Sequence, residues 1–215
     1  MNYKFFIIII ILSFTFSVNA QGILSDKNDF NRQDTLRGSI TKERIWWDLT
    51  YYHLDITVDP EKRTIYGSNE ISYDVIEPYH EMQIDLQQPL ILTRAEQNGK
   101  DLEIRHDGNA HFIKLKDTQI KGENNKIKVF YEGKPRVAVR APWDGGISWE
   151  RDKNGNHFIA SSCQGLGASV WWPNKDHMYD EVEGMLMSVN VPKGLTNISN
   201  GRLVKVDEMS ESTTF

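Results

Sequence analysis

The sequence predicts an all-β fold, built as a large antiparallel sheet of saddle-like shape or as a β-sandwich. Apolar and polar residues alternate along many short segments, which is the period of a half-buried strand. Turn residues separate these segments about every 8–12 positions. No segment carries an apolar stripe of helical period over the length of a helix. Together these three observations favour an antiparallel β architecture.

The longest alternation begins at Tyr52. Over residues 52–58 large apolar side chains occupy every second position, with polar residues between them. A turn led by Pro60 follows, and alternation resumes over residues 64–75. Two long strands joined by a short turn are typical of an antiparallel hairpin.

Shorter strands are expected after this hairpin. Asn98-Gly99 and Asp107-Gly108 are strong hairpin turns, and Asn200-Gly201 is expected to open a last hairpin that uses residues 203–206. The alternating segments are 82–86, 90–94, 102–104, 113–115, 127–131 and 185–191.

Residues 134–180 break the alternation. They hold Trp143, Trp149, Trp171 and Trp172, together with several glycine-rich stretches. A long region of this kind inside a β domain is usually functional. Tryptophans that merely cap an open end of the sandwich are the alternative.

The N-terminus has the organisation of a signal peptide over residues 1–20. Lys4 gives a positive start, Phe5 to Phe16 is almost wholly apolar, and small residues lead to Ala20. The apolar run is shorter than the roughly 20 residues of a membrane span. We therefore expect cleavage after Ala20 and an exported, periplasmic or extracellular protein with no membrane span after cleavage. Residues 21–44 are expected to be a flexible leader, and residues 45–215 the β domain.

Charge and cysteine content exclude several classes of protein. The net charge of −5 becomes −6 once Lys4 is removed, which argues against nucleic acid as a partner. Cys163 is the only cysteine, so the chain has no internal disulfide and no zinc-thiolate cluster.

The sequence also offers no metal or nucleophile site. His80-Glu81 begins like the zinc motif H-E-x-x-H, but Ile84 stands at the second ligand position. No G-x-S-x-G motif is present. We expect Cys163 to be a buried packing residue. We also expect the carboxylates at 176, 180, 181 and 183 to lie in a solvated turn.

Gln164 stands out within residues 161–176. Gly165 and Gly167 follow it, and glycine permits positive φ and close approach of the backbone. An amide held there could accept a hydrogen bond from a cationic group. The residues themselves leave this role and that of a plain structural amide open.

Three motifs resemble the zinc aminopeptidases of the M1 family, the relatives of aminopeptidase N and leukotriene A4 hydrolase. Residues 51–59 and 64–67 look like that family's opening hairpin. Ser162-Cys163-Gln164-Gly165, followed by Trp171-Trp172-Pro173 and Asp176, is similar to its substrate-contacting loop, and residues 189–192 fit the next strand.

The resemblance implies an N-terminal substrate-recognition domain of an exopeptidase. The family's zinc ligands belong to the next domain, so zinc would be held by the full-length enzyme and this chain would be an inactive fragment. Gln164 matches the position that binds the free α-ammonium of the peptide substrate. No catalytic residue and no metal ligand is expected here, and the implied partners are a peptide N-terminus and a zinc-peptidase domain, in cis or in trans.

Two competing hypotheses remain. One is a stand-alone exported module that grips peptide or glycan with its tryptophan-rich loop. The other is a structural domain that docks on a separately encoded catalytic subunit.

Overall fold

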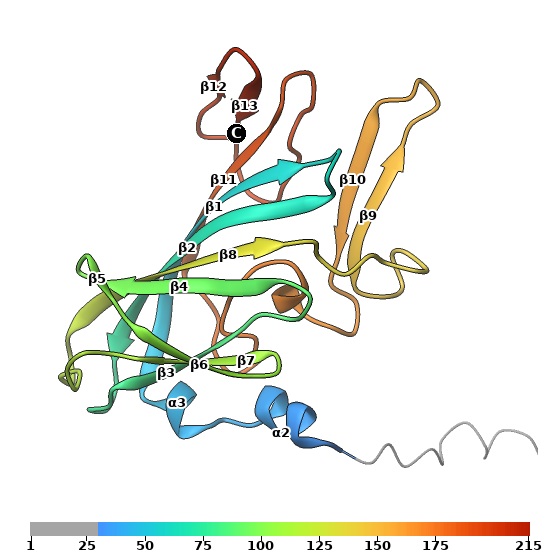
Figure 1. Ribbon diagram of the computed structural model, residues 1–215. Coiled ribbons are helices and arrows are strands. Elements are labelled where there is room, and N and C mark those ends of the chain that lie inside the picture. Colours follow the sequence, from blue (N-terminus) through green and yellow to red (C-terminus); the bar gives the residue numbers. More distant parts are fainter. Residues whose placement is uncertain (1–29) are drawn as a thin grey trace, which may run out of the picture. The chain divides into compact units, whose positions relative to one another are not determined.

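The computed structural model describes residues 30–215, so the predicted signal peptide and most of the predicted leader lie outside the described residues. Strands dominate the described part, which confirms the all-β prediction (Figure 1). The largest sheet has the order β12-β13-β11-β1-β2-β8-β4-β5. Its strands are β1 (Trp47–Asp59), β2 (Thr64–Val75), β4 (Ile91–Gln97), β5 (Lys100–Asp101), β8 (Asn124–Gly133), β11 (Gly184–Pro192), β12 (Asp207–Glu208) and β13 (Ser212–Thr214).

The opening hairpin forms as the alternation predicts. β1 and β2 pair in antiparallel register from Asp59 opposite Thr64 to Trp47 opposite Val75. Tyr52, Leu54 and Ile56 are buried on one face of β1. Alternation therefore reports both the strand and its inward face.

The large sheet is mixed, which corrects the expectation of an antiparallel sheet. β11 runs parallel to β1, from Tyr51 beside Gly184 to Thr57 beside Asn190. Side chains alternate between the two faces in either strand direction, so the sequence pattern does not distinguish a parallel from an antiparallel neighbour.

A second sheet packs on the large one. Its order is β3-β7-β6, with bounds β3 (Glu81–Asp85), β6 (Glu103–Asp107) and β7 (Ala110–Lys114). Met82 and Ile84 of β3 and Ile113 of β7 share one buried cluster with Leu54 and Ile71 of the large sheet. The main core therefore lies between these two sheets, as in a sandwich.

The region expected to be irregular contains a third sheet. β9 (Gly146–Arg151) and β10 (His157–Ser162) form a hairpin, turned at Asn154-Gly155. Ile147 and Trp149 of β9 are buried, whereas Phe158 of β10 is exposed. The sequence does not show this hairpin because β9 alternates over only four residues and Phe158, Ile159 and Ala160 of β10 form a short apolar run without alternation.

The segment before β1 is helical, although the sequence predicts a flexible leader up to residue 44. It contains α2 (Arg32–Gly38) and α3 (Lys42–Ile45), and Leu36 and Arg44 are buried. Neither helix is long enough to show a periodic stripe. The folded domain therefore begins before residue 45. Among residues 30–215, no helix is long and apolar enough to span a membrane.

The predicted C-terminal hairpin forms at a different place. Residues 203–206 are not a strand, and Asn200-Gly201 lies in an irregular connection. The last hairpin instead joins β12 to β13, with Met209 N bonded to Ser212 O. β13 pairs with β11, so Phe215 lies beside Val189.

Candidate substrate-recognition loop

The Cys163–Gly167 turn begins where β10 ends. Leu166 N and Gly167 N both donate to Cys163 O, at 3.1 and 2.9 Å. Gly165 and Gly167 have φ of 72° and 78°, a region that residues with a side chain rarely occupy. A β-carbon on Gly167 would also collide with the carboxylate of Asp176. Glycine is therefore required at 167 for both backbone conformation and space.

Gln164 is exposed on this turn. Within residues 30–215 its side chain makes no hydrogen bond, so its amide oxygen is free to accept one from a ligand. This is the arrangement that a recognition role needs, and it excludes an amide bonded to its own sheet.

Cys163 is exposed, which corrects the prediction of a buried packing residue. Its sulfur lies close to the side chain of Trp171. Desolvation raises the pKa of the thiol, and the nearby Trp171 side chain opposes that rise. The thiol is thus accessible but partly shielded.

The segment after the turn is anchored in the core. It passes through η1 (Ala168–Val170), and Trp172 packs edge-on against Tyr52 with ring centroids 5.0 Å apart. Asn69 Nδ2 donates to Pro173 O at 2.9 Å. Asp85 and Asn174 then exchange backbone hydrogen bonds of 2.8 and 3.1 Å. The loop is consequently fixed to β1, β2 and β3.

A buried ion pair supports this anchor. Arg44 Nη2 lies 2.5 Å from Asp85 Oδ2, and both side chains are almost fully buried. Asp85 also accepts hydrogen bonds from Gln83 Nε2 at 2.9 Å and from Asp176 N at 3.2 Å. Burial raises the pKa of Asp85, and the adjacent Arg44 guanidinium opposes that rise. One carboxylate thus joins α3, β3 and the loop.

Lys175 forms a second buried pair, with Asp180. Its Nζ donates to Trp47 O at 2.7 Å and lies 3.8 Å from the centre of the Trp47 ring. Burial lowers the pKa of Lys175 to about 8, and Asp180 opposes that shift. The Asp180 side chain is 3% exposed, which corrects its assignment to a solvated turn.

The histidines do not build a metal centre. His111 Nε2 donates to Leu86 O at 3.1 Å, and its Nδ1 faces His106 Nδ1 at 2.7 Å. Burial lowers the pKa of His111 to about 4, so the ring is neutral and accepts from His106. Across residues 30–215, no group of three or more His, Cys, Asp or Glu side chains could hold a metal ion. The described residues therefore offer no ligand set for a zinc ion.

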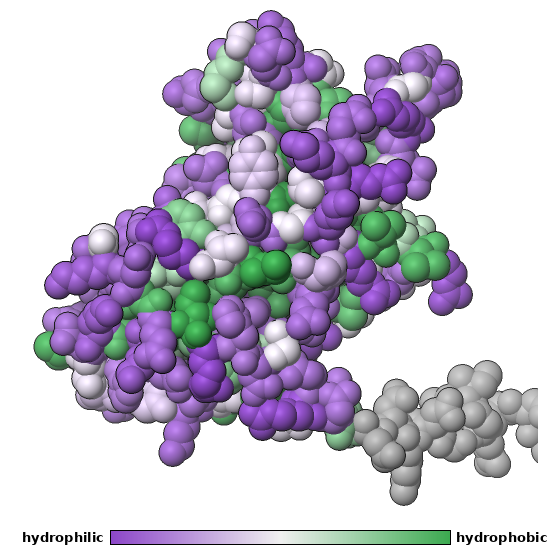
Figure 2. Space-filling view, in the orientation of Figure 1, coloured by the Kyte–Doolittle hydropathy of each residue, from purple (hydrophilic) through white to green (hydrophobic). Residues whose placement is uncertain are grey.

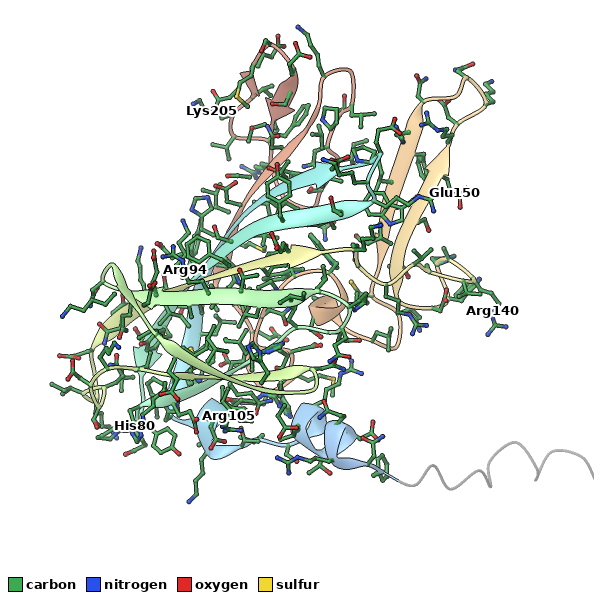
Figure 3. The ribbon with its side chains drawn as sticks, in the orientation of Figure 1. His80, Arg94, Arg105, Arg140, Glu150 and Lys205 are labelled. Carbon is green, nitrogen blue, oxygen red and sulfur yellow. The ribbon has the colours of Figure 1, made fainter. Side chains whose placement is uncertain are left out.

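A polar cavity of about 410 Å³ lies between the β1–β2 turn and the β9–β10 hairpin. Glu61 accepts hydrogen bonds from His157 Nε2 at 2.8 Å and from Arg151 Nη2 at 3.3 Å across this gap. Glu150 is exposed on β9 beside it (Figure 3). Glu61, His157 and Arg151 therefore hydrogen-bond to one another, and these bonds hold the β9–β10 hairpin to the β1–β2 turn.

An apolar patch occupies the connection between β8 and β9, where it stands out in Figure 2. Val139 is 82% exposed and Trp143 is 78% exposed, and Val137 is exposed beside them. Asp144 fixes this connection by accepting from Val139 N and Arg140 N at 2.7 and 2.8 Å. The connection is therefore an ordered loop that presents apolar side chains.

Solved structures show which fold this is. A mutant of a two-domain M1 zinc metallopeptidase bound to L-arginine matches with a TM-score of 0.65 and 21% identity, over 80% of this chain and 38% of that chain. A mutant M1 zinc metallopeptidase from Deinococcus radiodurans, bound to a Tyr-Ser-Ala substrate, gives 0.66 and 19%, over 83% and 40%. Yeast leukotriene A4 hydrolase gives 0.60 and 13%, over 79% and 26%.

These matches confirm the predicted fold, that of the N-terminal portion of M1 zinc metallopeptidases. The chain spans about 40% or less of the length of the structures it matches. No protein-family model and no curated protein sequence matches it.

Proposed function

We propose that this chain is the substrate-recognition part of an exported zinc aminopeptidase, which removes N-terminal residues from peptides. In this role Gln164 accepts a hydrogen bond from the free α-ammonium group of the peptide. The free, exposed amide on an anchored glycine turn is the observation that carries the proposal. The shared fold and the Tyr-Ser-Ala substrate of one matched structure support it.

The proposed contribution of Gln164 is positioning. A hydrogen bond between a neutral group and a charged one contributes about 1.5–3 kcal/mol. A neutral amide attracts an ammonium less strongly than a carboxylate does, so a carboxylate outside the described residues would supply most of the attraction. The amide would select a free amino terminus and hold it in one orientation.

Zinc chemistry in this proposal belongs to another part of the enzyme, because the described residues contain no suitable ligand cluster. When bound, zinc would supply an activated water and polarise the peptide carbonyl. The chain by itself would bind the peptide terminus without hydrolysing it. The catalytic zinc-peptidase domain, in cis or in trans, is therefore its proposed partner.

Export is proposed from residues 1–20. Their charge and apolar pattern is that of a cleaved signal peptide. A periplasmic or extracellular location follows if the segment is processed.

The test joins the chain to a zinc-peptidase domain of this fold family and measures hydrolysis of aminoacyl p-nitroanilides. Gln164→Ala is expected to lower kcat/KM about 10- to 100-fold, the loss of one charge-assisted hydrogen bond. Gln164→Glu should retain activity or raise it, because a carboxylate attracts the ammonium more strongly. Gln88→Ala, at another exposed glutamine, is the matched control and should leave kcat/KM unchanged. An unchanged kcat/KM in Gln164→Ala would refute the assigned role.

The exposed patch of Val139 and Trp143 favours a second candidate, a stand-alone peptide- or glycan-binding module. It predicts that the isolated chain binds oligosaccharides or N-acetylated peptides and that Trp143→Ala abolishes that binding. Binding that instead requires a free amino terminus and Gln164 supports the aminopeptidase role.

A further inference from the structure

The Arg44 side chain links α2, α3 and the residues between them by hydrogen bonds. Arg44 Nη1 donates to the carbonyl oxygens of Leu36, Arg37 and Ser39, at 3.0, 2.9 and 2.9 Å. These carbonyls lie at the end of α2 and just after it, where helix carbonyls lack intrahelical partners. The same guanidinium reaches Asp85 on β3. Residues 36–45 therefore form a fixed unit on the domain, which we call the N-terminal brace.

The brace directly contacts residues 163–177, which we call the recognition loop. Arg37 Nη1 donates to Gly165 O at 3.3 Å, one residue after Gln164. Arg37 Nε also lies 3.9 Å from Asp176 Oδ2. His177 Nε2 donates to Gly38 O at 3.1 Å. Both ends of the loop thus meet the brace.

Asp176 lies behind the turn. Ser169 Oγ donates to its Oδ2 at 2.5 Å, and the carboxylate occupies the space that a side chain on Gly167 would need. Its backbone N–H donates to Asp85, the partner of Arg44. Because its side chain is only 17% exposed, the carboxylate is a rigid support for the turn.

A neighbouring contact fixes the same turn from the segment that follows β3. Gln87 Nε2 donates to Leu166 O at 2.5 Å and to Ser169 Oγ at 2.9 Å. A cavity of about 170 Å³, lined by Arg37, Leu166 and Ser169 among others, remains between α2 and the loop. Loss of the Arg37 contact would therefore leave the turn space to move.

We propose that Arg37 and Asp176 are positioning residues, which fix the turn so that Gln164 presents its amide to the ligand. The part of this inference that concerns the ligand rests on the proposed function. Neither residue touches the ligand in this scheme; both act through the backbone of residues 163–167. The segment before β1 is then part of the recognition site rather than a leader.

Cys163 makes the inference testable in the described chain. It is the single cysteine, is exposed, and immediately precedes Gln164. Its alkylation rate therefore reports the conformation of this turn. The thiol is partly desolvated in the fixed turn, so a looser turn should react faster.

The experiment measures the pH-independent second-order rate constant of the Cys163 thiolate with iodoacetamide, taken from the pH–rate profile of each variant, because Asp176 itself raises the pKa of this thiol. Arg37→Ala and Asp176→Asn are expected to raise the rate about three- to tenfold through local opening, with no loss of the cooperative unfolding transition. Arg37→Lys should restore the rate to within about twofold, because it keeps a cation beside Asp176. Lys42→Ala removes an exposed cation of the same segment and is the matched control. Wild-type rates in both Arg37→Ala and Asp176→Asn would overturn the inference.

A second measurement separates this inference from the proposed function. In the joined enzyme, Arg37→Ala should lower kcat/KM only while Gln164 is present, and should have no further effect in a Gln164→Ala background. If Arg37→Ala raises the alkylation rate but leaves kcat/KM unchanged, the recognition role of Gln164 is refuted. The conclusion that Arg37 fixes the turn is then still supported. An equal loss of kcat/KM in both backgrounds would show that Arg37 does not act through Gln164.

Discussion

Replacement of Arg44 by Met tests whether the brace belongs to the cooperative fold. Met keeps most of the apolar stem but removes the charge and every donor. Arg44 is 0% exposed and bonds three carbonyl oxygens and the Asp85 carboxylate. Removal of one partner of a buried ion pair costs about 3–5 kcal/mol, because the other charge stays buried. We expect a loss of about 4 kcal/mol, a large share of the roughly 5–15 kcal/mol of a typical domain.

The measurement is urea unfolding followed by tryptophan fluorescence, because Trp46 and Trp47 are buried next to Arg44 in the chain. At an m value of roughly 2.5 kcal/mol/M, the expected loss lowers the midpoint by about 1.5 M urea. Lys42→Met, an exposed cation on the same helix, is the control and should change the midpoint little. A loss below about 1 kcal/mol for Arg44→Met, or one equal to the control, would refute the reasoning.

The pH dependence of that loss provides a specific signature. Without Arg44 the pKa of Asp85 should rise further, because the opposing charge is gone. A group whose pKa is raised in the folded state contributes stability at low pH, and this contribution disappears as pH rises through the folded pKa. The difference between wild type and Arg44→Met should therefore be smaller at pH 4.5 than at pH 7.5. A difference that grows on acidification would contradict this account of Asp85.

Two further predictions concern neighbouring parts of the loop. The pKa of Lys175 is lowered to about 8, so the folded state loses this proton at a lower pH than the unfolded state does. The free energy of unfolding should therefore rise with pH, by about 1.5 kcal/mol between pH 8 and 9.5 as measured by urea unfolding. This rise should be absent in Lys175→Met. Falling stability across that window, compared with Lys175→Met, would contradict the lowered pKa. Gly167→Ala should cost about 2 kcal/mol or more through strain and the clash with Asp176, whereas Gly165→Ala, with open space around its β-carbon, should cost about 1 kcal/mol. Equal costs in a denaturation series would show that Asp176 does not pack on position 167.

The sequence predicted the strands whose side chains alternate, because that pattern follows directly from burial on one face. β1 and β2 were found in this way. β9 and β10 were missed, although Asn154-Gly155 is a strong hairpin turn. The alternation in β9 is only four residues long, and β10 has a short apolar run at residues 158–160 in place of alternation. The parallel β1–β11 pair was missed because strand direction leaves no local mark in the sequence.

The candidate site was only partly predictable. The glycines after Gln164 drew attention to this residue, its ligand-binding role was implied only by the family resemblance, and the structure shows that the residue is exposed. The supporting residues were not found. Arg44 and Asp85 are far apart in sequence. A charged residue that is buried with a partner cannot be distinguished in the sequence from one at the surface. Arg37 lies in a segment whose composition favours disorder, so its contact with Gly165 depended on tertiary structure.

The parallel pairing of β1 with β11 has a consequence for biosynthesis. One edge of β1 stays without hydrogen bonds until residues 184–190 have been synthesised, so the nascent chain exposes that open edge during this interval. Exposed strand edges recruit other chains. A chaperone that keeps the polypeptide unfolded until β11 is available would protect it from aggregation during this interval.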